Sequence, residues 1–113
     1  MHEYAITKSL VQMASSKAEE AGSKRIIEIR IVVGQLSTYF DESIQMYFDI
    51  ISKGTLAEGS KLIFHSVPAE FYCSKCVSNF VKPKNGFECP KCGLSGSPTE
   101  IGKEFYIESI EVE

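Results

Sequence analysis

The sequence lacks several features that would assign it to common functional classes. It has only two histidines among 113 residues, so enzyme chemistry has few candidate groups. Lys and Arg number 12 against 15 Asp and Glu, so the chain lacks the positive excess typical of proteins that coat nucleic acid. No apolar run approaches the ~20 residues that span a bilayer. We therefore expect a non-enzyme that binds neither nucleic acid nor membrane.

The amino terminus also lacks a secretion signal. Residues 1–4 are Met-His-Glu-Tyr, without the basic start and following apolar block of a signal peptide. We therefore expect a cytoplasmic protein, whose cysteines are kept reduced. With 43% hydrophobic and 24% charged residues, the chain has the composition of a folded protein. Its length corresponds to one domain, or to one domain with a small insert.

Residues 72–102 differ in composition from the sequence on either side. This block contains all four cysteines, three of the four prolines and four of the eight glycines. It carries four basic and two acidic residues, whereas both flanking segments are net acidic. A shift of this kind marks a separate small unit. We predict an inserted domain at 72–102 within a domain made of residues 1–71 and 103–113.

The remaining sequence shows two helical patterns. Spacings of three and four predict a first helix that ends near Gly22, with a buried stripe of Ile6, Leu10, Met13, Ala14, Ala18 and Ala21. The same spacing predicts a second helix within 41–52, with a stripe of Ile44, Tyr47, Phe48 and Ile51.

Strand patterns alternate with these helices. We predict strands over 25–33, 61–72 and 104–112, the first with Ile27, Ile29, Ile31 and Val33 on its core face. The fold class is therefore α/β, with two helices packed on a small three-stranded sheet and an inserted zinc-ribbon-like four-cysteine domain. If the last two strands pair as a hairpin, the insert lies at its tip.

The cysteines form two C-x-x-C pairs. Cys73 and Cys76 make the first pair, Cys89 and Cys92 the second, and 12 residues separate the pairs. Each pair directs two thiolates at one point, and two pairs facing each other form a tetrahedral zinc site. A site filled by four sulfur atoms has no open position, so its zinc is structural.

Other uses of the cysteines are less well supported. Two disulfides require an oxidising compartment, and a redox C-x-x-C normally opens a helix in a thioredoxin-like unit. A zinc ribbon alone leaves three roles open: a nucleic-acid module, a contact between proteins, or a clip that folds the insert.

The first two residues form a second potential metal site. A terminal amine has a pKa of about 7.7–8.0, low enough for a metal to displace its proton near neutrality. The Met1 amine, the His2 imidazole and intervening deprotonated amides give a planar nitrogen set that suits Ni(II) or Cu(II). The alternative is a solvated histidine, as in any chain that starts Met-His. Glu3 either hydrogen-bonds the imidazole or simply favours the start of the helix.

Together these motifs resemble the HypA/HybF family of nickel metallochaperones for [NiFe]-hydrogenase maturation. The resemblance rests on Met1-His2-Glu3, Gly34-Gln35-Leu36, Val67-Pro68-Ala69, the paired C-x-x-C motifs and Ser109-Ile110-Glu111-Val112-Glu113. It covers essentially the whole chain, with the motifs in the order found in the family.

The resemblance implies a function and its residues. Nickel would be held at the amino terminus by Met1, His2 and Glu3, and zinc by Cys73, Cys76, Cys89 and Cys92. The implied partners are the GTPase HypB, the hydrogenase large subunit and, in some organisms, urease accessory proteins, and we expect a monomer or weak homodimer. A zinc-ribbon module that binds nucleic acid or protein without metal cargo is the alternative function.

Two features depart from the family pattern. Many relatives have a histidine beside a C-x-x-C pair, whereas Val77 and Gly93 follow the two pairs here. Tyr4 replaces a frequent aliphatic residue. The other histidine, His65, lies in a predicted strand without neighbouring ligands, so we expect it to be structural or exposed.

Overall fold

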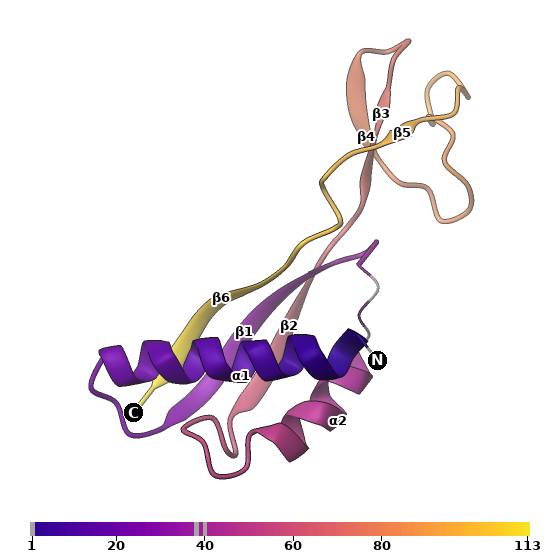
Figure 1. The fold of residues 1–113 in the computed structure, drawn as a ribbon. Helices are drawn as coiled ribbons and strands as arrows, with labels where there is room; N and C mark the ends of the chain where they lie inside the picture. The colour runs from indigo at the N-terminus through magenta and orange to yellow at the C-terminus, as the bar shows by residue number, and fades with distance from the viewer. Residues whose placement is uncertain (1, 38, 40) are drawn as a thin grey trace. The chain divides into compact units, whose positions relative to one another are not determined.

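The computed structural model of the chain describes residues 2–37, 39 and 41–113, and for His2 only the backbone (Figure 1). Contacts divide the chain into two compact units. The first comprises Met1–Val32, Thr38–His65 and Tyr106–Glu113. The second comprises Val33–Ser37 and Ser66–Phe105, and thus contains the predicted insert together with segments on both sides of it.

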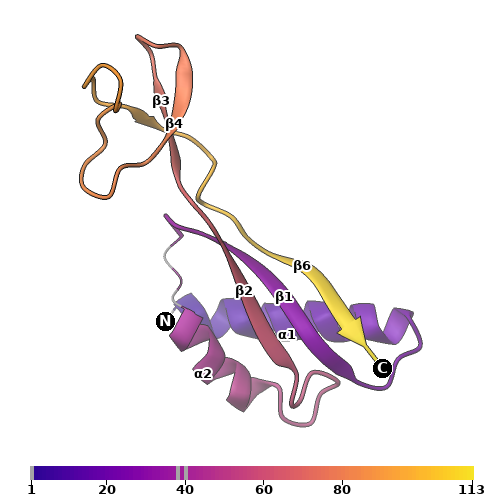
Figure 2. The ribbon, with the colours of Figure 1, turned by 180° about the vertical axis from the view of Figure 1, so that it is seen from behind.

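The first unit is built on the predicted layers. Helix α1 (His2–Glu20) lies along one face of a three-stranded sheet, and α2 (Asp41–Ile51) packs against α1 (Figures 1 and 2). The sheet has the order β2 (Lys61–Val67), β1 (Ile26–Gly34), β6 (Phe105–Val112). The predicted α/β class, with two helices on three strands, is confirmed.

Hydrogen bonds at the strand ends give the strand directions. At one end the Ser60 hydroxyl donates to the Ile26 carbonyl, and at the other the Gln35 amide donates to the Val67 carbonyl, so β1 and β2 are parallel. The Glu113 amide donates to the Arg25 carbonyl, next to the start of β1, so β6 is antiparallel to β1. Helix α2 is therefore the crossover that two parallel neighbours require.

The last two predicted strands of this sheet do not form the hairpin that the sequence left open. Strand β1 lies between β2 and β6, so these two do not pair. The physical reason is burial, because a central strand is covered by neighbours on both sides and β1 is the most apolar of the three. Its residues Ile31, Val32 and Val33 are all buried in succession.

The buried stripe of α1 differs partly from the prediction. Leu10, Ala14 and Ala18 are buried as predicted, whereas Met13 is 54% exposed and Ala21 is also exposed. Thr7 and Val11 are buried in addition. The observed set 7, 10, 11, 14 and 18 follows helical periodicity closely, so the buried face is rotated slightly from the predicted one.

The other predicted cores are confirmed with one correction. Ile44 and Phe48 of α2 are buried, with Tyr47 and Ile51 partly so. In β1, Ile29 and Ile31 are buried but Ile27 is 37% exposed. Ile26 is buried instead, because the loop after α2 covers it and its amide donates to the Leu56 carbonyl.

The second unit contains a small sheet of its own. Strands β3 (Glu70–Cys73), β4 (Ser78–Val81) and β5 (Ser97–Pro98) are arranged in the order β4-β3-β5, and β3 is antiparallel to both neighbours. The strand predicted over 61–72 is therefore two strands, β2 and β3. Pro68 has no N–H for a sheet ladder, and the chain leaves one sheet there before entering the next.

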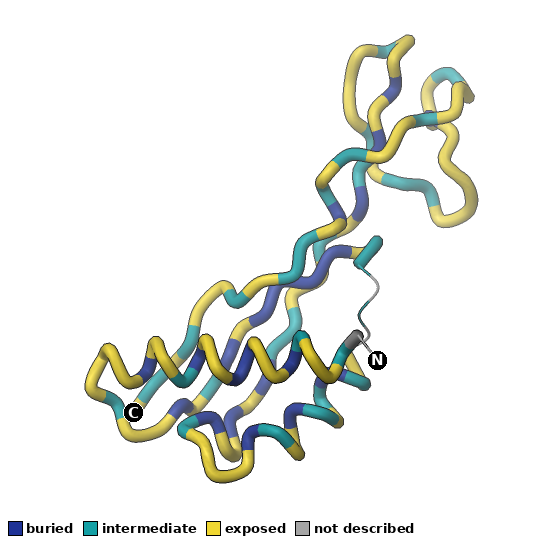
Figure 3. Tube along the Cα trace, in the orientation of Figure 1, coloured by how far each residue is buried: buried dark blue, intermediate teal, exposed yellow. Residues whose placement is uncertain are grey.

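Burial is uneven along the chain. Figure 3 shows buried residues along β1 and at regular intervals on α1, whereas most residues in 74–100 are exposed. Within the described residues, neither helix combines the length and apolarity needed to cross a bilayer.

Candidate metal centre

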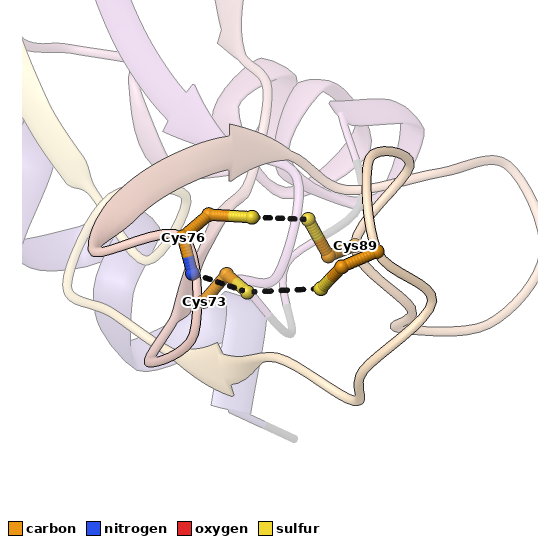
Figure 4. A group of neighbouring side chains, drawn as sticks. Cys73, Cys76 and Cys89 are labelled. Carbon is orange, nitrogen blue, oxygen red and sulfur yellow. Dashed lines mark hydrogen bonds between the residues drawn. The ribbon is translucent and has the colours of Figure 1, made fainter.

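The four cysteines meet at one point of the second unit. Cys73 ends β3, Cys76 lies in the turn before β4, and Cys89 and Cys92 lie in the following loop (Figure 4). The Cys73 and Cys92 sulfur atoms are 3.5 Å apart, and those of Cys76 and Cys89 are 3.9 Å apart. All four sulfur atoms lie within 4.8 Å of one another.

This arrangement fits a tetrahedral zinc ion. Zn–S bonds of about 2.3 Å place the sulfur atoms of such a site roughly 3.8 Å apart. The Cys73–Cys92 and Cys76–Cys89 sulfur contacts straddle that value and join one C-x-x-C pair to the other. All four cysteines are free of disulfides. The cluster suits a structural zinc with no open coordination position.

Each C-x-x-C pair is held by backbone hydrogen bonds of its own turn. In the first, Cys73 pairs with Ser78 across the β3–β4 hairpin, and the Cys76 amide points at the Cys73 sulfur at 3.4 Å. In the second, the Cys89 amide donates to the Leu94 carbonyl, and the Gly93 amide donates to the Cys89 carbonyl. We call these turns the first and second knuckles.

The residue after each knuckle has a left-handed backbone. Gly93 has φ +78° and Val77 has φ +53°. Glycine adopts this conformation readily, whereas for a β-branched residue it is a rare and strained one. The two knuckles thus share a geometry but satisfy it with different residues.

Hydrogen bonding gives the Cys73 and Cys76 thiols different pKa values. The Cys76 amide, which points at the Cys73 sulfur, lowers the pKa of Cys73 to about 7. Contacts with the neighbouring sulfur atoms, first that of Cys73, raise the pKa of Cys76 to about 12. Of these two thiols, Cys73 is therefore the more readily deprotonated.

Little apolar packing supports the metal centre. Phe71 is buried, stacks on Phe87 with ring centroids 5.2 Å apart, and meets Phe80 at 6.3 Å. Gly96 allows this contact, because a Cβ there would lie 2.5 Å from the Phe80 ring. The Lys82 ammonium lies 5.2 Å from the Phe87 ring centroid and covers one of its faces. Of these three rings Phe71 alone is buried, and such limited apolar packing explains the need for a metal.

The structure gives only a partial view of the predicted nickel residues. Met1 and the His2 side chain lie outside the described residues. Helix α1 begins at His2, and Glu3 is in its first turn. The ring of Tyr4 contacts that of Tyr47 in α2 edge to face, with centroids 5.5 Å apart. His65, which was expected to be either structural or exposed, is exposed in β2.

Comparison with known proteins identifies the family. The family model described as "Hydrogenase/urease nickel incorporation, metallochaperone, hypA" matches residues 1–112. The chain belongs to the HypA family. It is 43% identical over its whole length to the hydrogenase maturation factor HypA of Caldanaerobacter subterraneus subsp. tengcongensis, all of which is covered. It is 41% identical to HypA of Dehalococcoides mccartyi, over the whole chain and 95% of that protein.

Two solved HypA structures share the fold. The solution structure of the Ni metallochaperone HypA from Helicobacter pylori matches with a TM-score of 0.66 and 20% identity, over 97% of this chain and 96% of that one. Another HypA solution structure matches with a TM-score of 0.73 and 22% identity, over 100% and 97%. Family membership makes the chain a nickel metallochaperone of hydrogenase maturation, and the nucleic-acid alternative is not favoured.

The family motif at 34–36 has a structural role that spacing did not reveal. The Gly34 amide donates to the Glu104 carbonyl, and the Leu36 amide donates to the Gly102 carbonyl. The Gln35 side chain accepts a hydrogen bond of 2.8 Å from the Ala69 amide, directly after Pro68. These residues therefore join the two segments by which the chain enters and leaves the zinc-binding region.

Only glycine fits at the centre of this junction. A Cβ on Gly34 would lie 2.1 Å from the Gly102 carbonyl oxygen, and one on Gly102 would lie 2.6 Å from the Ala69 Cα. Glycine in a strand often marks a close approach of two backbones. That signal was present in the sequence, but the sequence did not indicate which segment would approach.

Proposed function

We propose that this chain holds its Ni(II) cargo at the amino terminus, through the Met1 amine, His2 and Glu3, and releases it to a protein partner. The observation that carries the proposal is the start of α1 at His2. The first four N–H groups of a helix have no acceptor within the helix. The amides of His2 and Glu3 are therefore not committed to helical hydrogen bonds.

Free amides matter because of the geometry that nickel prefers. A terminal amine, deprotonated amides and an imidazole make a square-planar nitrogen set, which suits Ni(II) better than the tetrahedral preference of zinc. The positive end of the helix dipole also favours negative groups at this position, such as a deprotonated amide or the Glu3 carboxylate.

Packing and hydrogen bonding hold the start of α1 from Glu3 onward in place. The edge-to-face contact of Tyr4 with Tyr47 ties the first turn of α1 to α2. Thr7 is fully buried, and its hydroxyl donates to the Glu3 carbonyl. A metal site on an anchored turn loses less conformational entropy on binding than one on a free tail.

The rest of the proposal divides the chain by role. Residues 1–71 and 103–113 would form the nickel-binding domain, and 72–102 a domain shaped by zinc on Cys73, Cys76, Cys89 and Cys92. The protein would act in the cytoplasm as a non-enzyme. Its partners would be the GTPase HypB, the hydrogenase large subunit and, where urease is present, urease accessory proteins. Its place in the HypA family supports these expectations.

Isothermal titration of Ni(II) into the zinc-loaded full chain tests the site. We expect nickel binding to be lost when one residue is added before Met1 and in His2→Ala, with zinc content unchanged. His65→Ala is the matched control, because it removes the other histidine, which is exposed in β2. Nickel binding that survives both amino-terminal changes would place the cargo elsewhere.

A further inference from the structure

Four exposed residues lie in or directly beside the two knuckles. They are Lys75 in the first knuckle with Val77 directly after it, and Lys91 in the second knuckle with Leu94 after it, and we call this set the knuckle surface. Val77 is 71% exposed and Leu94 is 44% exposed. Both knuckles converge on the same four sulfur atoms, so each of these residues lies within two positions of a cysteine of that cluster.

Neither backbone preference nor burial accounts for a valine at position 77. Its φ of +53° is a strained conformation for a β-branched residue, and glycine fills the equivalent place in the second knuckle. A strained residue usually persists because burial or function compensates. Burial does not compensate at Val77, since most of its side chain is in solvent.

The charges on this surface are uncompensated by neighbouring acids. Among the described residues, neither Lys75 nor Lys91 forms an ion pair. The carboxylates of the second unit are engaged elsewhere: Glu70 with Asn79, Glu88 with the Phe87 amide, Glu104 with the Gly102 amide and Glu100 with Lys103. The knuckle surface thus presents two unpaired cations beside two exposed apolar side chains.

We propose that the knuckle surface docks an acidic segment of a partner protein that carries apolar side chains. The two lysines would pair with its carboxylates, and Val77 and Leu94 would be covered by its apolar residues. A protein fits better than a nucleic acid, because the surface contains no aromatic ring on which a base could stack. Zinc fixes both knuckles, so docking depends on a loaded zinc site and is separate from nickel binding.

Selection of a random phage-displayed peptide library on the zinc-loaded full chain tests this proposal. We expect the enriched peptides to combine Asp or Glu with Leu, Ile or Phe, and to bind more weakly as salt rises. Val77→Asn should reduce their affinity about tenfold, and Lys75→Glu combined with Lys91→Glu should reduce it further. Asparagine tolerates the left-handed backbone, so Val77→Asn should keep its zinc and its melting temperature.

Matched controls lie in the same unit but off the knuckles. Val81→Thr changes another exposed valine, on β4, and Lys84→Glu reverses another exposed lysine, so both should leave peptide binding unchanged. The proposal is overturned if selection enriches no peptides or basic ones, or if the variants and the parent bind the selected peptides equally. It is also overturned if a single-stranded DNA oligonucleotide binds with the dependence on Lys75, Val77 and Lys91 that is expected of the peptides.

Discussion

The two units of this chain are stabilised in different ways. The first contains most of the buried apolar side chains, among them Leu10, Ile29, Ile44 and Phe48, all at most 1% exposed. In the second, the described buried apolar side chains are Val33, Ala69, Phe71, Cys73 and Cys89. Two of these five are cysteines of the sulfur cluster.

The contrast shows how a short chain can form two folded units although most of its buried apolar side chains lie in one of them. Residues 66–105 are too few and too exposed to fold on apolar burial alone. A zinc–thiolate cluster supplies the missing stabilisation, because the energy of metal binding is also folding energy. We therefore expect loss of zinc to unfold the second unit and loss of apolar packing to destabilise the first.

Removal of the metal should have the largest effect. We expect Cys73→Ser or Cys92→Ser to unfold the second unit, because a structural zinc contributes on the order of 10 kcal/mol. The first unit should keep its own backbone resonances in a two-dimensional amide NMR spectrum of the full chain. Ser74→Ala, in the same knuckle, should retain zinc. A cysteine variant that kept both zinc and melting temperature would argue against the four-sulfur site.

The reverse experiment damages the apolar core. Phe48 is 1% exposed in α2, so Phe48→Ala should destabilise the first unit by about 3–5 kcal/mol. Zinc content, measured with a chromogenic chelator under native conditions, should not change. Met46→Ala removes an exposed side chain of the same helix and should be nearly neutral in urea unfolding. Loss of zinc in Phe48→Ala would show that the units are not independent.

An intermediate effect is expected at the junction of residues 33–37. Gln35→Ala removes the acceptor of the Ala69 amide and should destabilise the second unit by about 1–3 kcal/mol. Hydrogen exchange at Ala69 reports this change directly and should speed up. Gln35→Glu retains a side-chain oxygen and should lose less. Equal exchange in Gln35→Ala and the parent would contradict a structural role for this side chain.

The smallest effect should come from exchanging the residues that follow the knuckles. Val77→Gly relieves the left-handed strain but loosens the unfolded chain, so it should leave zinc affinity unchanged or raise it by up to ~1 kcal/mol. Gly93→Val introduces the strain into the second knuckle and should lower zinc affinity by about 1–2 kcal/mol. Competition with a zinc chelator measures the zinc affinity of both variants. If both lose the same affinity, side-chain packing rather than backbone strain determines zinc binding at these positions.

Local patterns in the sequence predicted much of this molecule. The spacing of Cys73, Cys76, Cys89 and Cys92 gave the sulfur cluster, because each pair lies in one turn of chain. Helical periodicity gave Ile44 and Phe48 as core. The errors concern contacts between distant segments: Ile26 replaced Ile27 in the core, because the loop after α2 covers it.

The sequence by itself determined the element types, the four-cysteine cluster and the family, since these depend on residue identity over short spans. Only the tertiary structure decided that β1 lies between β2 and β6, because strand order depends on which long-range pairing buries most apolar surface. It also assigned a role to Gly34 and Gln35, whose partners Gly102 and Ala69 lie more than 30 residues away. It showed that one zinc knuckle retains a strained valine where the other has glycine.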